Sequence, residues 1–113
     1  MADCLFCKIA AGQIKGDIFY KDEQIIALRD INPQAPVHLL VLPVVHLANL
    51  AEAQDKAPAL LAELVKKSAD LGRSIGGDKG YRLVVNTGPD GGQTVEHLHF
   101  HLLAGRELLW PPG

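Results

Sequence analysis

Three histidines near the C-terminal end alternate with apolar residues. The stretch "VEHLHFHLL" holds His97, His99 and His101, three of the five histidines in a chain of 113 residues. Alternate side chains of a β-strand face the same side, so we expect the three imidazoles to share one face. Leu98 and Phe100 would then face the core. Such a strict two-residue period disfavours the view that a solvated strand simply uses histidine by chance.

Neighbouring imidazoles can support two kinds of chemistry. The spacing of His97 and His99 allows a zinc site, because His-x-His on a strand can supply two ligands. It also allows nucleophilic catalysis. Like charges disfavour each other's ionisation, so at least one ring should stay neutral at pH 7. A neutral ring can attack when its other nitrogen donates to a carbonyl, while a neighbouring histidine cation holds a phosphate oxygen.

A glycine-rich segment, "NTGPDGGQT", directly precedes the histidines. It is longer than the roughly 2–5 residues of most hairpin loops. Its glycines would let backbone amides approach an anion closely, as in phosphate-binding nests, and Asn86 and Thr94 could add neutral donors. An ordinary surface turn is the alternative. Placed next to three aligned imidazoles, the loop favours phosphate chemistry.

The two cysteines, Cys4 and Cys7, form a lone C-x-x-C pair. No thioredoxin-like βαβ pattern surrounds them, which argues against a redox pair. Buried free thiols are one interpretation. The other is half of a structural zinc site, for which His46 and His97 are the candidate further ligands.

Composition narrows the functional class. The formal net charge is −2 and no cluster of Lys or Arg is present, which argues against nucleic-acid binding. The longest apolar run, "LLVLPVV", is too short to cross a bilayer, and the start lacks the pattern of a signal peptide. We therefore expect a cytoplasmic protein that acts without a membrane, with cysteines as thiols or ligands.

The periodicity predicts one α+β domain over residues 1–113, with an antiparallel sheet of about five strands. A short N-terminal helix should end at Gly12. Asp55 is the expected N-cap of one long helix that ends at Gly76-Gly77. The apolar face of that helix would comprise Leu60, Leu61, Leu64, Val65 and Leu71. The expected strands are residues 18–21, 24–29, 37–43, 81–86 and 95–103.

The string "HLHFHLL" matches the His-φ-His-φ-His-φ-φ signature of the histidine triad (HIT) family, where φ is apolar. "FCKI", "ALRDINPQAPVHLLVLP", "GYRLVVNTGPDGGQTVEH" and "WPPG" resemble the Hint branch, so the resemblance covers nearly the whole chain. It implies a HIT-like fold and a nucleotide-binding hydrolase or transferase. Hint-type members cleave purine nucleoside phosphoramidates, with no cofactor required for the chemistry.

Carried over by position, the resemblance implies that His99 attacks the α-phosphorus and forms a nucleotidyl-histidine, which water then hydrolyses. His97 and His101 would assist through phosphate contacts and proton handling, and His38 would support His99. The implied nucleotide contacts are Asn86, Gly92, Gln93 and Thr94 at the phosphate, Asp30 at the ribose, and Phe6, Ile9, Leu28 and Ile31 at the base. Threonine replaces the serine common at position 94 but keeps the hydroxyl. Without the resemblance, the four base residues would be taken as core and Asp30 as a loop cap.

The resemblance also bears on zinc and on assembly. Some bacterial-type HIT proteins bind structural zinc through a similar cysteine pair plus two histidines, whereas animal Hint proteins generally lack the pair. A zinc-bound His97 would not be a free proton carrier. The apolar end with Leu108, Leu109 and Trp110 either packs on its own domain or marks an interface. The resemblance implies a homodimer, with Trp110 near the partner's site.

Two rival functions stay open at this point. One is a zinc-dependent hydrolase that uses the histidine cluster as ligands. The other is a nucleotide-binding regulatory module with little catalysis. The leaving group and the choice between adenine and guanine are not written in these residues.

Overall fold

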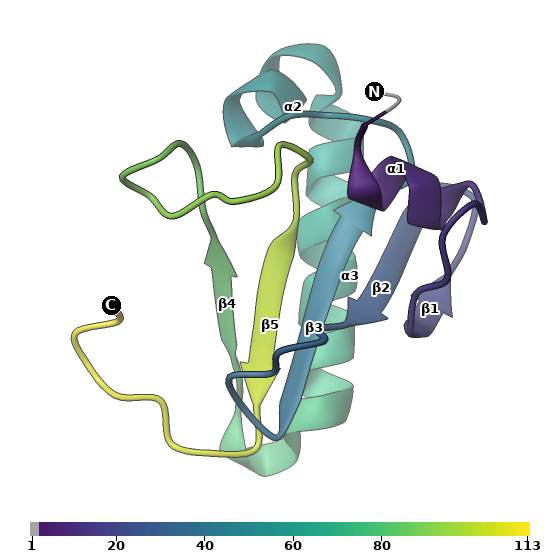
Figure 1. Ribbon diagram of the computed structural model, residues 1–113. Helices are drawn as coiled ribbons and strands as arrows, with labels where there is room; N and C mark the ends of the chain where they lie inside the picture. Colours follow the sequence, from purple (N-terminus) through teal and green to yellow (C-terminus); the bar gives the residue numbers. More distant parts are fainter. Residues whose placement is uncertain (1–2) are drawn as a thin grey trace.

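The structure, a computed structural model, describes residues 3–113 as an α+β fold built on one antiparallel sheet (Figure 1). The strand order is β1-β2-β3-β5-β4, and every neighbouring pair is antiparallel. This confirms the predicted fold class. The elements are α1 (Leu5–Ala10), β1 (Ile18–Lys21), β2 (Ile25–Arg29), β3 (Val37–Pro43), α2 (Leu50–Lys56), α3 (Pro58–Gly76), the 3-10 helix η1 (Gly77–Lys79), β4 (Arg82–Val85) and β5 (Phe100–Ala104).

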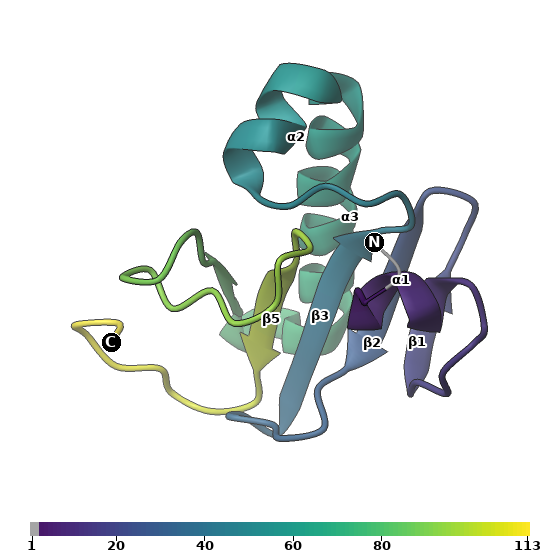
Figure 2. The same cartoon turned by 45° about the horizontal axis from the view of Figure 1, so that its top comes forward.

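A helix packs on each face of the sheet, α3 on one and α1 on the other (Figures 1 and 2), and buried apolar residues lie beneath both helices. On one face, Leu64 of α3 is fully buried against alternate residues such as Val41 and Phe100. On the other face, Phe6 and Ile9 of α1 pack with residues such as Leu40. No helix within residues 3–113 has the length and apolar character that crossing a membrane requires.

The predicted long helix begins later than expected, and a separate helix precedes it. Asp55 caps neither helix. Asn49 is the N-cap of α2, because its side chain accepts a hydrogen bond from the amide of Glu52 at 3.0 Å, and Ala57 precedes α3 without a side-chain capping bond. Asp55 lies inside α2. The break between α2 and α3 falls at Ala57, because the residue before Pro58 is sterically driven out of helical geometry, and Ala57 has φ −146°.

The apolar face of α3 is narrower than predicted. Leu60, Leu61 and Leu71 are partly buried against the core around Leu64, but Val65 is 45% exposed. The predicted end at Gly76-Gly77 is confirmed, since α3 stops at Gly76 and Gly77 takes φ 56°.

The last strand is shorter than predicted, because β5 begins only at Phe100. His97 and His99 lie in the irregular segment that leads into it. The alternation of faces nevertheless holds. Leu98 and Phe100 join the core under α3, whereas the rings of His97 and His99 both pack edge-on against Phe6 of α1.

Candidate active site and metal site

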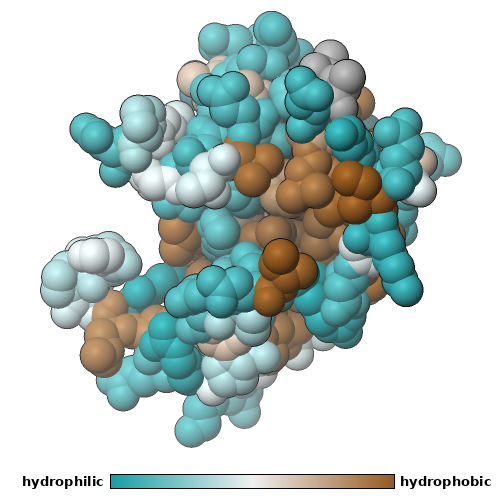
Figure 3. All heavy atoms as spheres, viewed as in Figure 1, coloured by the Kyte–Doolittle hydropathy of each residue, from teal (hydrophilic) through white to brown (hydrophobic). Residues whose placement is uncertain are grey.

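A pocket of about 410 Å³ lies on the α1 side of the sheet, within the usual size range of small-molecule sites. Figure 3 shows apolar side chains gathered over this face. The lining residues include Phe6, Ile9, Lys15, Leu28, Asp30, Ile31, Thr94, His99 and His101. The pocket therefore combines an apolar wall with two imidazoles, a carboxylate and a hydroxyl.

A backbone carbonyl fixes the tautomer of His99. Its Nδ1 lies 2.7 Å from the backbone oxygen of His97. A carbonyl can only accept, so Nδ1 carries a proton, and in the neutral ring Nε2 keeps its lone pair. Within residues 3–113, no group hydrogen-bonds Nε2 of this buried ring. The hydrogen bond to a carbonyl that the sequence analysis required of an attacking imidazole is therefore present at His99.

His38 supports His101 rather than His99, which corrects the role expected for it. The amide N–H of Gln34 donates to Nδ1 of His38 at 3.1 Å. The proton of neutral His38 must then sit on Nε2, which donates to Nδ1 of His101 at 2.9 Å. By the same logic neutral His101 carries its proton on Nε2.

The electrostatics favour neutral rings in the free protein. Burial lowers the pKa of His101 to about 4, assisted by the charges of His99 and His38 and opposed by Asp30. Burial also lowers the pKa of His38, again opposed by Asp30. His101 can therefore serve as a neutral hydrogen-bond donor in the free protein, which differs from the histidine cation considered from the sequence.

The expected base and ribose residues line the pocket, as does Thr94. Ile31 is not a core residue, because it is 99% exposed at the pocket rim. Asp30 accepts a hydrogen bond from the amide of Asn32 through Oδ1 at 2.8 Å. Its Oδ2 lies 3.6 Å from Nε2 of His38, so the carboxylate borders the histidine pair.

Three of the expected phosphate contacts lie elsewhere. Asn86, Gly92 and Gln93 do not line the pocket. The side chain of Gln93 donates to the backbone oxygens of Ala48 and Val95 and accepts from the amide of Gly88. The amide group of Asn86 donates to the oxygen of Gly91. In this structure the amide group of Gln93 is therefore fully used in holding the glycine-rich loop, whereas Asn86 makes a single hydrogen bond to that loop.

Three residues at or beside the pocket were missed in the sequence analysis: Gln34, Lys15 and Gly16. The amide N–H of Gln34 fixes the proton on His38, but a backbone group leaves no signal in the residue type. Lys15 and Gly16 line the far end of the pocket. They follow a short helix in a stretch without periodicity, and only the folded chain shows where they lie.

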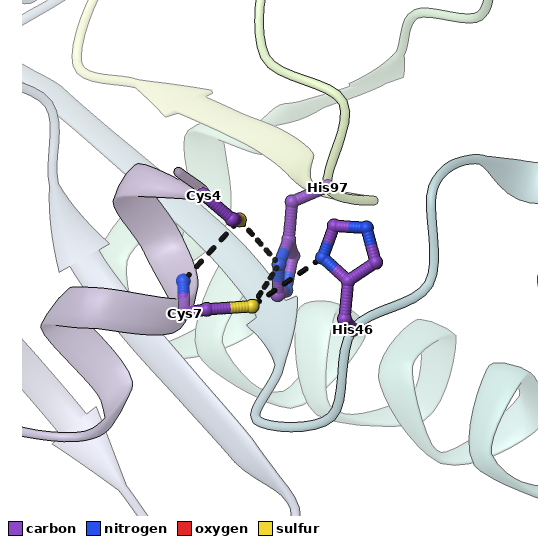
Figure 4. A group of neighbouring side chains, drawn as sticks. All are labelled: Cys4, Cys7, His46 and His97. Carbon is purple, nitrogen blue, oxygen red and sulfur yellow. Dashed lines mark hydrogen bonds between the residues drawn. The ribbon is translucent and has the colours of Figure 1, made fainter. Parts of the chain in front are cut away.

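Cys4, Cys7, His46 and His97 meet at a second site, which is the arrangement required by the zinc interpretation of the sequence (Figure 4). Their ligand atoms all lie within 4.8 Å of one another. Sγ of Cys4 and Nδ1 of His97 are 3.3 Å apart, as are Sγ of Cys7 and Nδ1 of His46. Cys4 caps α1 and Cys7 follows one turn later, so a six-residue helix supplies both thiols.

The donor set fits zinc. Bonds of about 2.3 Å to sulfur and 2.0–2.1 Å to nitrogen place tetrahedral S and N ligands about 3.5 Å apart, close to the observed 3.3–3.5 Å. Nε2 of His97 donates to the oxygen of Pro43 at 2.8 Å, which leaves Nδ1 as the ligand and orients the ring. Burial raises the pKa of Cys7, with Cys4 adding to the effect, so a cation is needed to stabilise the thiolate form.

Asp30, His38 and His101 form a second cluster whose atoms are of the types that bind metal ions and lie close together. The lone pairs of the two histidines in this cluster are already used in hydrogen bonds. The lone pair of His101 Nδ1 accepts from His38, and that of His38 Nδ1 accepts from Gln34. The two groups are therefore chemically distinct: one consists of thiols and imidazoles of the types that bind zinc, and the other is a hydrogen-bonded histidine pair beside a carboxylate.

The sequence model of the HIT domain matches residues 11–108. The chain belongs to the HIT family. It is 51% identical to a HIT-like protein of Synechococcus elongatus over 98% of this chain and 97% of that protein. It is 43% identical to the "14 kDa zinc-binding protein" of Zea mays over 96% of this chain and 87% of that protein.

Solved structures of HIT proteins share the fold. A HIT family hydrolase from Legionella pneumophila has a TM-score of 0.93 and 46% identity, with 98% and 100% of the two chains covered. A histidine triad protein from Clostridium difficile has a TM-score of 0.90 and 38% identity, with 96% of each chain covered. These names state the family and not the branch, so membership of the Hint branch stays a prediction.

The C-terminal tail of this HIT protein leaves the sheet next to β4 (Figures 1 and 2). Trp110 is 82% exposed and Leu109 is 68% exposed, so the tail does not bury its apolar end on its own domain. Arg82 holds only the base of the tail, by donating to the backbone oxygens of Leu108 and Leu109.

Proposed function

We propose that this HIT protein is a hydrolase of the Hint type, which cleaves the P–N bond of purine nucleoside 5′-phosphoramidates. The observation that carries the proposal is the hydrogen bond from His99 Nδ1 to the carbonyl of His97. This hydrogen bond leaves the lone pair of His99 Nε2, in the neutral ring, available to attack a substrate in a pocket with an apolar wall. The names of the similar solved proteins support hydrolysis in general.

In the proposed first step, the lone pair of His99 Nε2 forms a bond to the α-phosphorus, and the bond from phosphorus to the amine nitrogen breaks. The bonding pair stays on the amine, which takes a proton delivered through Nε2 of His101 and replaced there from solvent. In the second step water attacks phosphorus and loses a proton to the solvent, and His99 departs with its electron pair. The nucleoside monophosphate and the amine are the products.

The pocket supports a nucleotide as the substrate. The apolar side chains of Phe6, Ile9 and Leu28 would enclose the base, with Ile31 at the rim. Asp30 lies between this wall and the histidines, where a ribose would bridge base and phosphate. An anionic phosphate beside His101 would also raise its pKa and strengthen its role as a donor.

We also propose that Cys4, Cys7, His46 and His97 hold a structural zinc. Four protein ligands fill a tetrahedral site, whereas catalytic zinc keeps an open position. When bound, the ion would contribute cross-linking of α1 to the segments around His46 and His97 and no chemistry at phosphorus. This supports a metal-independent reaction over the zinc-dependent alternative. The zinc-binding relative from Zea mays adds to the support for zinc itself.

A homodimer is a further part of the proposal. The exposed apolar side chains of Leu109 and Trp110 in the tail form a surface of the kind that another protein chain often covers. A second copy would place Trp110 near its partner's pocket. Molar mass by light scattering tests this directly: a parent dimer that weakens in Trp110→Ala supports it, and a monomeric parent contradicts it.

The deciding experiment measures AMP release from adenosine 5′-phosphoramidate by the parent and by His99→Ala, each with and without a chelator. We expect chelator-insensitive turnover in the parent, none in the variant, and an adenylylated parent in the intact mass after acid quenching. Circular dichroism checks that the variant is folded. Tight AMP binding without turnover in the parent would instead assign a regulatory module, and chelator-sensitive turnover without an adduct a zinc hydrolase.

A further inference from the structure

The base of the C-terminal tail is docked on the loop between β2 and β3 (Figure 1). Nε of Arg106 donates to the backbone oxygen of Gln34 at 3.0 Å. Nη1 of the same guanidinium donates to the oxygen of Glu107 at 2.9 Å, which ties the side chain to its own tail. Gly105, with φ +99°, comes so close to Pro36 that an added Cβ would lie 2.8 Å from the Cβ of Pro36. Two independent contacts therefore hold this loop from the tail side.

The held loop carries the group that decides the protonation pattern of His38. The amide of Gln34 donates to Nδ1 of His38 at 3.1 Å, and the amide of Asp30 donates to the backbone oxygen of His38 at 3.0 Å. The oxygen and the amide of Gln34 thus link Arg106 on one side to His38 on the other.

The ring nitrogen that carries the proton of His38 determines which ring nitrogen carries the proton of His101. While Gln34 donates to Nδ1, the His38 proton stays on Nε2 and occupies the lone pair of His101 Nδ1. The proton of His101 then sits on Nε2. If the Gln34 amide moved away, His38 could carry its proton on Nδ1, and the bond to His101 would reverse. Nε2 of His101 would become an acceptor, unable to protonate a departing amine.

We propose that Arg106 is a positioning residue that keeps His101 in its proton-donating form, acting through Gln34 and His38. Arg106 does not line the pocket, so its effect reaches the reaction only through this chain of hydrogen bonds. The inference rests on the proposed function, because it concerns proton delivery to the leaving amine.

The test compares two substrates that differ in their need for a proton. The amine of adenosine 5′-phosphoramidate must be protonated to leave, whereas the p-nitrophenyl ester of AMP releases a stable anion. Weakening one hydrogen bond is expected to lower kcat of Arg106→Ala for the phosphoramidate about fivefold. The ester rate and the KM for both substrates should stay within about twofold of the parent, and Arg106→Lys, which keeps a donor, should recover part of the loss.

Arg82→Ala is the matched control. It removes the other arginine that holds the tail, at Leu108 and Leu109, without touching the loop that carries Gln34. We expect it to leave the ratio of the two rates unchanged. An equal loss on both substrates in Arg106→Ala, or the same change of ratio in Arg82→Ala, would overturn the proposal.

Nitrogen-15 NMR of the histidine rings provides a readout independent of turnover. The parent should show the His101 proton on Nε2, and Arg106→Ala a mixture of the two neutral forms. If the parent failed to hydrolyse the phosphoramidate, the proposed function would fail while the NMR comparison still tested the role of Arg106. An unchanged His101 pattern in a folded Arg106→Ala protein would refute that role.

Discussion

Removal of the metal should lower both the stability of the protein and its affinity for nucleotide. Helix α1 has six residues, too few to persist alone in water. Its attachments are the buried side chains Phe6 and Ile9 and the two thiols at the metal site. Phe6 packs edge-on against His99 with ring centroids 5.1 Å apart. A helix released from its ligands would therefore loosen one wall of the pocket.

The magnitude follows from ligand linkage. A ligand that binds only the folded state at 1,000 times its dissociation constant stabilises that state by about 4 kcal/mol. For a domain near 100 residues, 1 kcal/mol shifts Tm by about 4–8 °C. We therefore expect the chelated parent to melt at least about 15 °C below the zinc-loaded parent. The dissociation constant for AMP should rise about tenfold, with kcat changed less.

The assay is differential scanning calorimetry and AMP titration on parent, Cys7→Ser and Lys8→Ala, each with zinc and with chelator. Cys7 contacts both His46 and His97, so Cys7→Ser should melt like the chelated parent under both conditions. Lys8 lies on the same helix but contributes no ligand atom, so Lys8→Ala should respond to zinc like the parent. A parent whose Tm and AMP affinity are the same in zinc and in chelator would refute this reasoning.

Three other perturbations give separate expectations. The pKa of His101 is about 4 in the folded state against an ordinary 6.5. As the pH falls, His101 is therefore protonated in the unfolded chain before it is protonated in the folded protein. The free energy of unfolding should therefore fall as pH drops from about 6.5 to about 4, less so in His101→Asn, as urea titrations at several pH values would show. Leu64→Ala should lose about 2–5 kcal/mol of stability in urea titration, whereas Val65→Ala on the exposed side should lose less than 1 kcal/mol. An added Cβ at Gly16 would lie 2.7 Å from Cγ2 of Ile9, so Gly16→Ala should raise the KM for nucleotide severalfold with kcat retained, and an unchanged KM would contradict the placement of the base.

Much of this fold is readable from local pattern. β3 is an uninterrupted apolar run and matches its predicted bounds at Val37 and Pro43. The break at Ala57 was also encoded, by Pro58, but Asp55 is as good a capping residue as Asn49 by type alone. Asn49 caps α2, a helix that the sequence analysis did not predict, and α3 begins at Pro58 without a side-chain cap. The boundary error therefore reflects a capping residue type at Asp55 that lies inside α2 and caps nothing.

In the candidate site, too, some features can be predicted from the sequence and others cannot. The residue types and the cysteine spacing predict the cluster of Cys4, Cys7, His46 and His97, because thiols and imidazoles are the side chains that zinc binds. The partner of His38 depends instead on strand register, since β3 pairs with β5 so that Leu40 faces His101 and His38 faces Leu103. That register places His38 diagonally from His101, within hydrogen-bond distance. Register between strands separated by more than 50 residues is not visible in either strand alone.

The three alternating histidines make different contacts, because each lies in a different environment. The ring of His97 is turned into the thiol cluster by the oxygen of Pro43, and its own backbone oxygen fixes the proton of His99. His101 receives its proton pattern from the neighbouring strand through His38. Of these three rings in their neutral form, only that of His99 keeps a nitrogen lone pair that no hydrogen bond or thiol contact uses among residues 3–113. A shared face thus brings the rings together, while backbone carbonyls and one loop amide make them chemically unequal.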